Sequence, residues 1–251
     1  MIDLEQRGEV HVVRLAHGGA NVLDLELCRE LSAVLSDLES AGAVVLTGSG
    51  RSFSAGVDLL RIVDGGGGYV REFLPALCAA ARGVFAHPRP LVAAINGHAI
   101  AGGCLIGCAA DRRLMAEGGG GIGVPELKVG VPFPAAALEI LRYSVSTVEA
   151  QRLIMGGHIL APAEALEVGL VDELAPSEDL VERAVATAEE LAAIPPASFA
   201  LTKEQLRGPA LARLDAEGEA LDERVTEIWT RSDVLAAIAA YVERTLKKRG
   251  G

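Results

Sequence analysis

The stretch over residues 96–111 constrains the fold most, because an apolar strand runs into it and a helix of small residues runs out of it. The strand reads LVAAI over 91–95, a short apolar run of the kind found in buried parallel sheets. Gly102 and Gly103 then open the helix. A helix N-terminus presents unpaired N–H groups and the positive end of the helix dipole. We therefore predict a strand, a turn and a helix whose bend can receive a developing oxyanion.

Strand and helix patterns alternate over the first three quarters of the chain. The short apolar runs that we expect to be strands cover 10–15, 43–47, 91–95, 113–116 and 170–174. Between them, an apolar helix face over 27–38 follows a candidate cap at Asp24, and Ser146 caps a later helix that ends at Gly156. Apolar strands separated by helices indicate an α/β core whose sheet is covered on both faces.

After Pro195 the pattern changes to helices alone. Residues 210–231 and 232–248 read as amphipathic helices, which need a partner surface for their apolar faces. We therefore divide the chain into an α/β core over 1–194, which holds the site, and a helical region over 195–251. This helical region is expected to dock on the core or on a neighbouring subunit.

Neither the glycine runs nor the cysteines form a ligand-binding motif. The runs at 65–68 and 118–121 lack the sequence context of phosphate loops, so we expect flexible loops there. No CxxC pair occurs among the cysteines, which are Cys28, Cys78, Cys104 and Cys108. This cysteine usage fits a reducing cytoplasm and predicts no metal site.

The charge balance limits the classes of partner. The 251 residues carry 23 basic and 34 acidic side chains, for a net charge of −11, which argues against a nucleic-acid-binding surface. The apolar stretch over 91–110 is as long as a membrane span, but Asn96, His98 and several glycines interrupt it. The first residues show no secretory signal. We expect a cytoplasmic protein with neither a nucleic-acid nor a membrane partner.

Three short motifs carry candidate chemistry, and each is weak alone. FSAGVDL can bring the backbone N–H groups of Ala55 and Gly56 close to a ligand. IAGGCLIG is the helix-opening turn described above. VPELKV places Glu126 behind a proline and among apolar neighbours, although a glutamate taken singly is expected to be a solvated surface residue.

In this spacing, PLVAAINGHAIAGGC, FSAGVDL and VPELKVG resemble the crotonase (enoyl-CoA hydratase/isomerase) superfamily, and the likeness runs from about residue 11 to the C-terminal helices. The resemblance implies a crotonase-like α/β core of repeated strand–strand–helix units and a helical C-terminal trimerisation region, in a homotrimer or a dimer of trimers. It also implies an acyl-CoA thioester as the substrate, with no further cofactor, bound with its carbonyl between two backbone N–H groups. Matched residue by residue, these N–H groups belong to Ala55 and Gly102.

The superfamily's hydratases carry two glutamates, and this chain matches one of them. The second falls on Glu126, whereas the first falls on Leu105. Leu105 lies one helical turn past Gly102 and is expected to project toward the thioester, where an apolar group cannot hold a water. Hydration needs a water held by two polar groups, but moving a double bond from C3 to C2 needs one base. We therefore predict a Δ3,Δ2-enoyl-CoA isomerase in which Glu126 carries a proton from C2 to C4, and AGGCLIG, VPFP and LAAIP…LTK resemble the mitochondrial type of that enzyme.

Further residues would complete the substrate site. Those expected to contact the acyl-CoA are Ser54, Gly56, Asp58, Gly103, Lys203 and Arg244, the last two near the CoA phosphates. His98 is expected to be held by the backbone rather than to bind a ligand.

Two alternatives to the isomerase stay open. A hydratase or another crotonase-type lyase would pair Glu126 with an acid from elsewhere, such as Glu72, which lies on a segment that borders the acyl pocket in this family. A non-catalytic acyl-CoA-binding homologue would keep the oxyanion pocket without turnover. Leu105 argues against the hydratase, and Glu126 argues against a pure binder, which gains nothing from an unpaired buried carboxylate.

Overall fold

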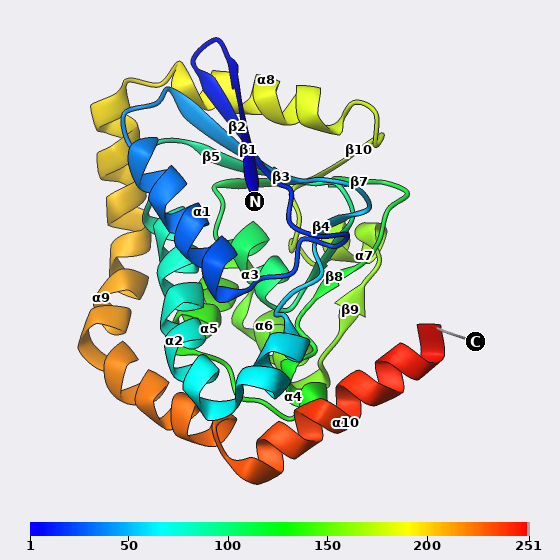
Figure 1. The fold of residues 1–251 in the computed structure, drawn as a ribbon. Coiled ribbons are helices and arrows are strands. Elements are labelled where there is room, and N and C mark those ends of the chain that lie inside the picture. The colour runs from blue at the N-terminus through cyan, green and yellow to red at the C-terminus, as the bar shows by residue number, and fades with distance from the viewer. Residues whose placement is uncertain (250–251) are drawn as a thin grey trace.

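The computed structural model describes the backbone of residues 1–249 and the side chains of residues 1–245. The strands of this part form two sheets (Figure 1). The larger sheet consists, in spatial order, of β1 (Ile2–Arg7), β2 (Val10–Leu15), β3 (Ala43–Gly48), β5 (Leu91–Ile95), β7 (Arg112–Ala116) and β10 (Glu173–Ala175). The smaller sheet consists, in spatial order, of β4 (Ser52–Ser54), β6 (His98–Ile100), β8 (Ile122–Gly123) and β9 (Ile159–Leu160).

The larger sheet is parallel from β2 to β10, and β1 pairs with β2 in the antiparallel sense. The first four predicted strands are confirmed as β2, β3, β5 and β7. The strand predicted over 170–174 is wrong in its bounds, because the N–H groups of Leu170 and Val171 donate to the carbonyl of Ala165 and close a turn. β10 therefore begins only at Glu173.

Helices cover both faces of the larger sheet, as the alternating pattern predicted (Figure 1). On one face lies α8, whose Leu180 and Ala184 pack in one apolar cluster with Val45 of β3. On the other face lies the main core with α1, whose predicted cap is confirmed: the Asp24 carboxylate accepts a hydrogen bond from the Leu27 N–H at 2.8 Å. The helices are α1 (Leu25–Asp37), α2 (Leu59–Ala86), α3 (Gly102–Cys108), α4 (Glu126–Val129), α5 (Ala135–Ser144), α6 (Thr147–Gly156), α7 (Pro162–Glu167), α8 (Leu180–Ala192), α9 (Pro196–Trp229) and α10 (Ser232–Arg249).

The first glycine run is not a loop, as the sequence suggested, but a kink inside α2. Gly66 has φ 55° and ψ −150°, and helix continues on both sides of it. Ile62 before the run and Val70 after it are fully buried, so packing on either side holds the glycines in the helix. The run at 118–121 is irregular, as predicted.

The C-terminal helices pack on the core of their own chain. α9 begins at Pro196, earlier than the hydrophobic pattern indicates. Val225, Trp229 and Ile238 belong to the main apolar core, so the two predicted regions share that core and the division at 194/195 stays a prediction. In Figure 1, α10 turns back and runs beside α4. Over the described residues, every helix is too short or too polar to cross a membrane.

Candidate active site

A cavity of about 470 Å³ lies where the two glycine turns, α4 and α10 meet. The turn before α2 contributes Ala55, Val57 and Asp58 to its wall, and the turn before α3 contributes Ala101. Glu126, the first residue of α4, lines the cavity as well, and α10 of the same chain supplies the remaining wall. The structure thus gathers the three sequence motifs around one space.

The hydrogen bonds of the first turn correct the predicted oxyanion donor. The N–H of Ala55 donates to the carbonyl of Ala20 at 2.9 Å, and the N–H of Gly56 donates to the side-chain oxygen of Ser54 at 3.2 Å. Within the described residues, the N–H of Val57 has no acceptor. Ala55 is therefore the wrong donor, since its hydrogen is already committed, and Val57 is the available one.

The second turn leaves further N–H groups unpaired. Ala101 donates its N–H to Gly123 at 2.8 Å and accepts from Leu105 at 3.0 Å, which holds this residue at both ends. No acceptor among the described residues meets the N–H groups of Gly102 and Gly103, as expected for the first residues of a helix. Gly102 is thus free to act as the predicted donor, and that role stays a prediction.

The two turns have the same backbone feature, a residue with positive φ, and they are in contact. Gly56 at φ 93° directly precedes Val57, and Ala101 at φ 53° directly precedes Gly102, so each free N–H follows a left-handed residue. A Cβ atom built on Gly102 would lie 3.6 Å from the Cγ2 atom of Val57. One built on Gly103 would lie only 2.4 Å from the Ser54 carbonyl oxygen. The turn before α2 and the start of α3 are therefore in close contact.

The carboxyl group of Glu126 is only partly satisfied by the described residues. Its Oε2 atom is buried, and no hydrogen-bonding group of the described residues reaches it. Burial raises the pKa of Glu126 to about 7. A carboxyl group with a pKa near neutrality can both take a proton and return it.

Asp58 and Leu105, which were also predicted to lie at the substrate site, are engaged in other contacts. Asp58 lines the cavity, but its carboxylate caps α2 by accepting from the N–H groups of Leu60 at 3.0 Å and Arg61 at 3.1 Å. Leu105 is 3% exposed, packs in the main core and is not among the residues that line the cavity, so its projection toward the thioester stays a prediction. Burial of α3 on all sides explains this packing, because every residue of this short helix is buried.

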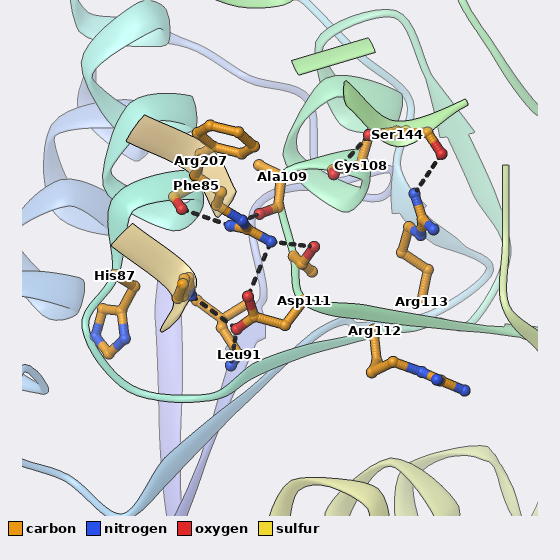
Figure 2. Close-up of polar contacts among 12 residues, drawn as sticks. Phe85, His87, Leu91, Cys108, Ala109, Asp111, Arg112, Arg113, Ser144 and Arg207 are labelled. Atoms are coloured by element: carbon orange, nitrogen blue, oxygen red, sulfur yellow. Dashed lines mark hydrogen bonds and ion pairs between the residues drawn. The ribbon is translucent and has the colours of Figure 1, made fainter. Parts of the chain in front are cut away.

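Lys203 lies outside the cavity, in a charge cluster with Asp111 and Arg207. Figure 2 shows Asp111 and Arg207 of this cluster side by side. The Nζ atom of Lys203 is 2.7 Å from Asp111, whose other carboxylate oxygen is 2.8 Å from Arg207. Desolvation lowers the pKa of Lys203 to about 8. Lys203 is thus paired with Asp111, and its predicted contact with the CoA phosphates stays a prediction. The sequence could not show this pairing, because Asp111, the partner of Lys203, lies 92 positions away and also accepts a hydrogen bond from Leu91 at the start of β5.

The remaining predicted residues take up different positions. Arg244 is exposed on α10, and its contact with substrate stays a prediction, as do those of Ser54, Gly56 and Gly103. Glu72 is exposed, accepts from Arg29 at 3.3 Å and does not line the cavity. His98 lies at the cavity edge, and its Nδ1 accepts from the Gly121 N–H at 3.1 Å, as expected for a backbone-held histidine. The described residues contain no group of three side chains able to hold a metal ion.

Comparison with known proteins assigns the chain to a family. The model of the enoyl-CoA hydratase/isomerase family matches residues 5–248. The chain belongs to this family. Its α/β crotonase fold matches the crystal structure of a human mitochondrial delta3-delta2-enoyl-CoA isomerase with a TM-score of 0.94, at 29% identity, over 100% of this chain and 99% of the other.

Some similar proteins of the family are named isomerases and others hydratases. A mitochondrial enoyl-CoA delta isomerase 1 of Mus musculus is 30% identical over 255 residues, which cover 100% of this chain and 88% of the relative. A putative enoyl-CoA hydratase of Thermus thermophilus is 35% identical over 254 residues, which cover 97% and 98%. Family membership therefore shows an acyl-CoA enzyme of the crotonase type and leaves the choice between isomerase and hydratase to the site.

Proposed function

We propose that this enzyme is a Δ3,Δ2-enoyl-CoA isomerase, which moves the double bond of a fatty acyl-CoA from C3 to C2. One observation carries the proposal: the carboxyl group of Glu126, whose buried Oε2 atom has no partner among the described residues, lines a largely apolar cavity together with two turns that offer free backbone N–H groups. One acid–base group and an oxyanion site are all that a 1,3-proton shift requires.

The proton moves from C2 to C4 by way of one carboxylate. The thioester carbonyl oxygen accepts hydrogen bonds from the N–H groups of Val57 and Gly102, which makes the C2 proton more acidic. Ionised Glu126 takes that proton, and the electron pair of the broken C–H bond spreads over the dienolate. Protonated Glu126 then gives the proton to C4 as the double bond forms between C2 and C3. Each oxyanion donor contributes about 10²–10³ in rate, and acid–base catalysis contributes about 10²–10⁴.

A hydratase is the second candidate, favoured by the name of the Thermus thermophilus relative. Hydration needs a second polar group to hold the attacking water. Among the described residues that line the cavity, the other carboxylate is Asp58, which is occupied at the N-terminus of α2. Glu72 is exposed and engaged with Arg29. These placements weigh against the hydratase.

Separate incubations with a 3-enoyl-CoA and a 2-enoyl-CoA test the proposal. We expect the first to give the conjugated 2-enoyl product, seen as a rise in ultraviolet absorbance, and the second to give no 3-hydroxyacyl product beyond a trace. Dominant 3-hydroxyacyl-CoA formation from the 2-enoyl-CoA would establish the hydratase instead. Binding of both without any product would leave the non-catalytic acyl-CoA-binding alternative.

The pH profile should report the carboxyl group of Glu126. Since the base must be ionised and its pKa is raised to about 7, kcat/KM is expected to rise with pH and to level off above this value. Below it, the rate should fall about tenfold per pH unit, because the ionised fraction falls by that factor. Initial rates with a 3-enoyl-CoA over pH 5–9 measure the profile. A flat profile down to pH 5 would assign the proton transfer to another group.

A further inference from the structure

The residues that line the cavity differ widely in their exposure to solvent. Of the lining residues, Leu60 and Ile159 are 53% and 51% exposed, whereas Val131 and Trp229 are 2% and 3% exposed. The cavity therefore opens to solvent beside Leu60 and Ile159 and ends among buried side chains. The large CoA group can lie only at the open end.

Helix α4 gives the direction of the acyl chain within this cavity. Glu126 is its first residue and Val129 its last, so the two lie three positions apart on one helix face. Both line the cavity, about 4.5 Å apart along the helix axis. With C2 to C4 of a substrate at Glu126, the rest of the chain runs past Val129 and Val131 toward Trp229.

The indole of Trp229 is held firmly at the buried end. Its Nε1 donates to the carbonyl of Pro132 at 2.9 Å, directly after Val131 of the cavity wall. It stands at the last residue of α9, where α10 begins after a short bend, and Ile238 of α10 is fully buried in the same core. Moving the ring would break the hydrogen bond and open the junction between the two helices.

We propose that Trp229 is the residue that limits acyl chain length, so that short and medium straight chains fit and long chains do not. This inference rests on the proposed acyl-CoA site. Beyond C4, the wall offers space for a few methylenes, after which a longer chain meets a fixed ring. Trp229 is thus a specificity-determining residue that plays no part in the proton transfer.

Binding of saturated acyl-CoAs tests the inference without requiring turnover. We expect wild-type protein to bind dodecanoyl-CoA no more tightly than hexanoyl-CoA, measured by calorimetry. Trp229→Leu should raise the ratio of dodecanoyl-CoA to hexanoyl-CoA affinity by about tenfold, the effect of burying about two further methylenes. Trp229→Phe keeps an aromatic ring and should change the ratio less. Ile228→Ala, at the 40% exposed neighbouring position, should leave it at the wild-type value.

A second variant, which narrows the cavity instead of widening it, controls for a folding defect in Trp229→Leu. Val131→Phe adds a ring to the wall that Trp229 closes, so it should lower the affinity for decanoyl-CoA more than that for hexanoyl-CoA. An unchanged affinity ratio in both Trp229→Leu and Val131→Phe, each folded by circular dichroism, would overturn the inference. Failure of the isomerase assay alone would refute the proposed reaction while these ratios still report the pocket. Failure to bind any acyl-CoA would overturn both.

Discussion

Glu126→Gln is expected to lower kcat on a 3-enoyl-CoA by about 10³-fold, within the range of general acid–base catalysis. The amide is nearly isosteric with the carboxyl group but can neither accept the C2 proton nor return it to C4. Acyl-CoA affinity should change little, because the two turns proposed to hold the thioester are untouched. The measurement is steady-state turnover together with calorimetric binding of a saturated acyl-CoA. Turnover near the wild-type rate would remove Glu126 from the mechanism.

The same variant is expected to be more stable than the wild type at alkaline pH. The pKa of Glu126 is raised from 4.5 to about 7 in the folded protein, so folding favours its protonated form. That contribution is fully present below pH 4.5 and is lost as the pH rises through 7. At pH 8 Glu126→Gln should therefore gain about 3 kcal/mol of unfolding free energy over the wild type, and the gain should vanish near pH 4.

A matched control separates this effect from the loss of any acidic residue. Glu72→Gln changes an exposed carboxylate that is paired with Arg29 outside the cavity. It should alter neither kcat nor the pH dependence of unfolding in urea. A large loss of turnover in Glu72→Gln would instead revive the hydratase alternative with its second acid.

The sequence pattern correctly predicted the elements that depend only on nearby residues or on burial in an apolar core. The four central strands are continuous apolar runs, and the cap at Asp24 needs only the N–H of Leu27, three residues away. The kinked glycine run of α2 was missed because its helical state depends on burial of Ile62 and Val70 on either side. Intrinsic preference for a loop was overridden by tertiary packing.

In the site, too, local motifs predicted some features, whereas others depend on contacts between residues far apart in the sequence. The motifs indicated Glu126 and the turn at Gly102, and the family resemblance joined them. Which amide of the first turn is free depends on Ala20, 35 positions before Ala55, and no motif encodes that hydrogen bond. A sequence signal did exist, since the glycine of FSAGVDL marks where the chain reverses, and the free N–H belongs to the residue that follows it.

Gly103→Ala should disable the oxyanion site without altering any side chain that performs chemistry. A methyl group there would lie 2.4 Å from the carbonyl oxygen of Ser54 and 2.8 Å from its Cβ atom, distances that force the backbone to shift. The shift separates the turn of Val57 from the start of α3, so the two N–H groups no longer converge on one oxygen. Losing one such donor lowers kcat by about 10²–10³-fold.

The neighbouring glycine of α3 provides the control. A methyl group on Gly107 would meet the Cδ1 atom of Ile95 at 3.4 Å, an ordinary contact, so Gly107→Ala should keep the wild-type kcat. Overpacking in Gly103→Ala should also lower the unfolding free energy by about 1–3 kcal/mol. Binding of CoA itself, measured on the folded variant, distinguishes a misaligned site from an unfolded one. If folded Gly103→Ala turned over 3-enoyl-CoA at the wild-type rate, contact between the two turns would not be what aligns the donors.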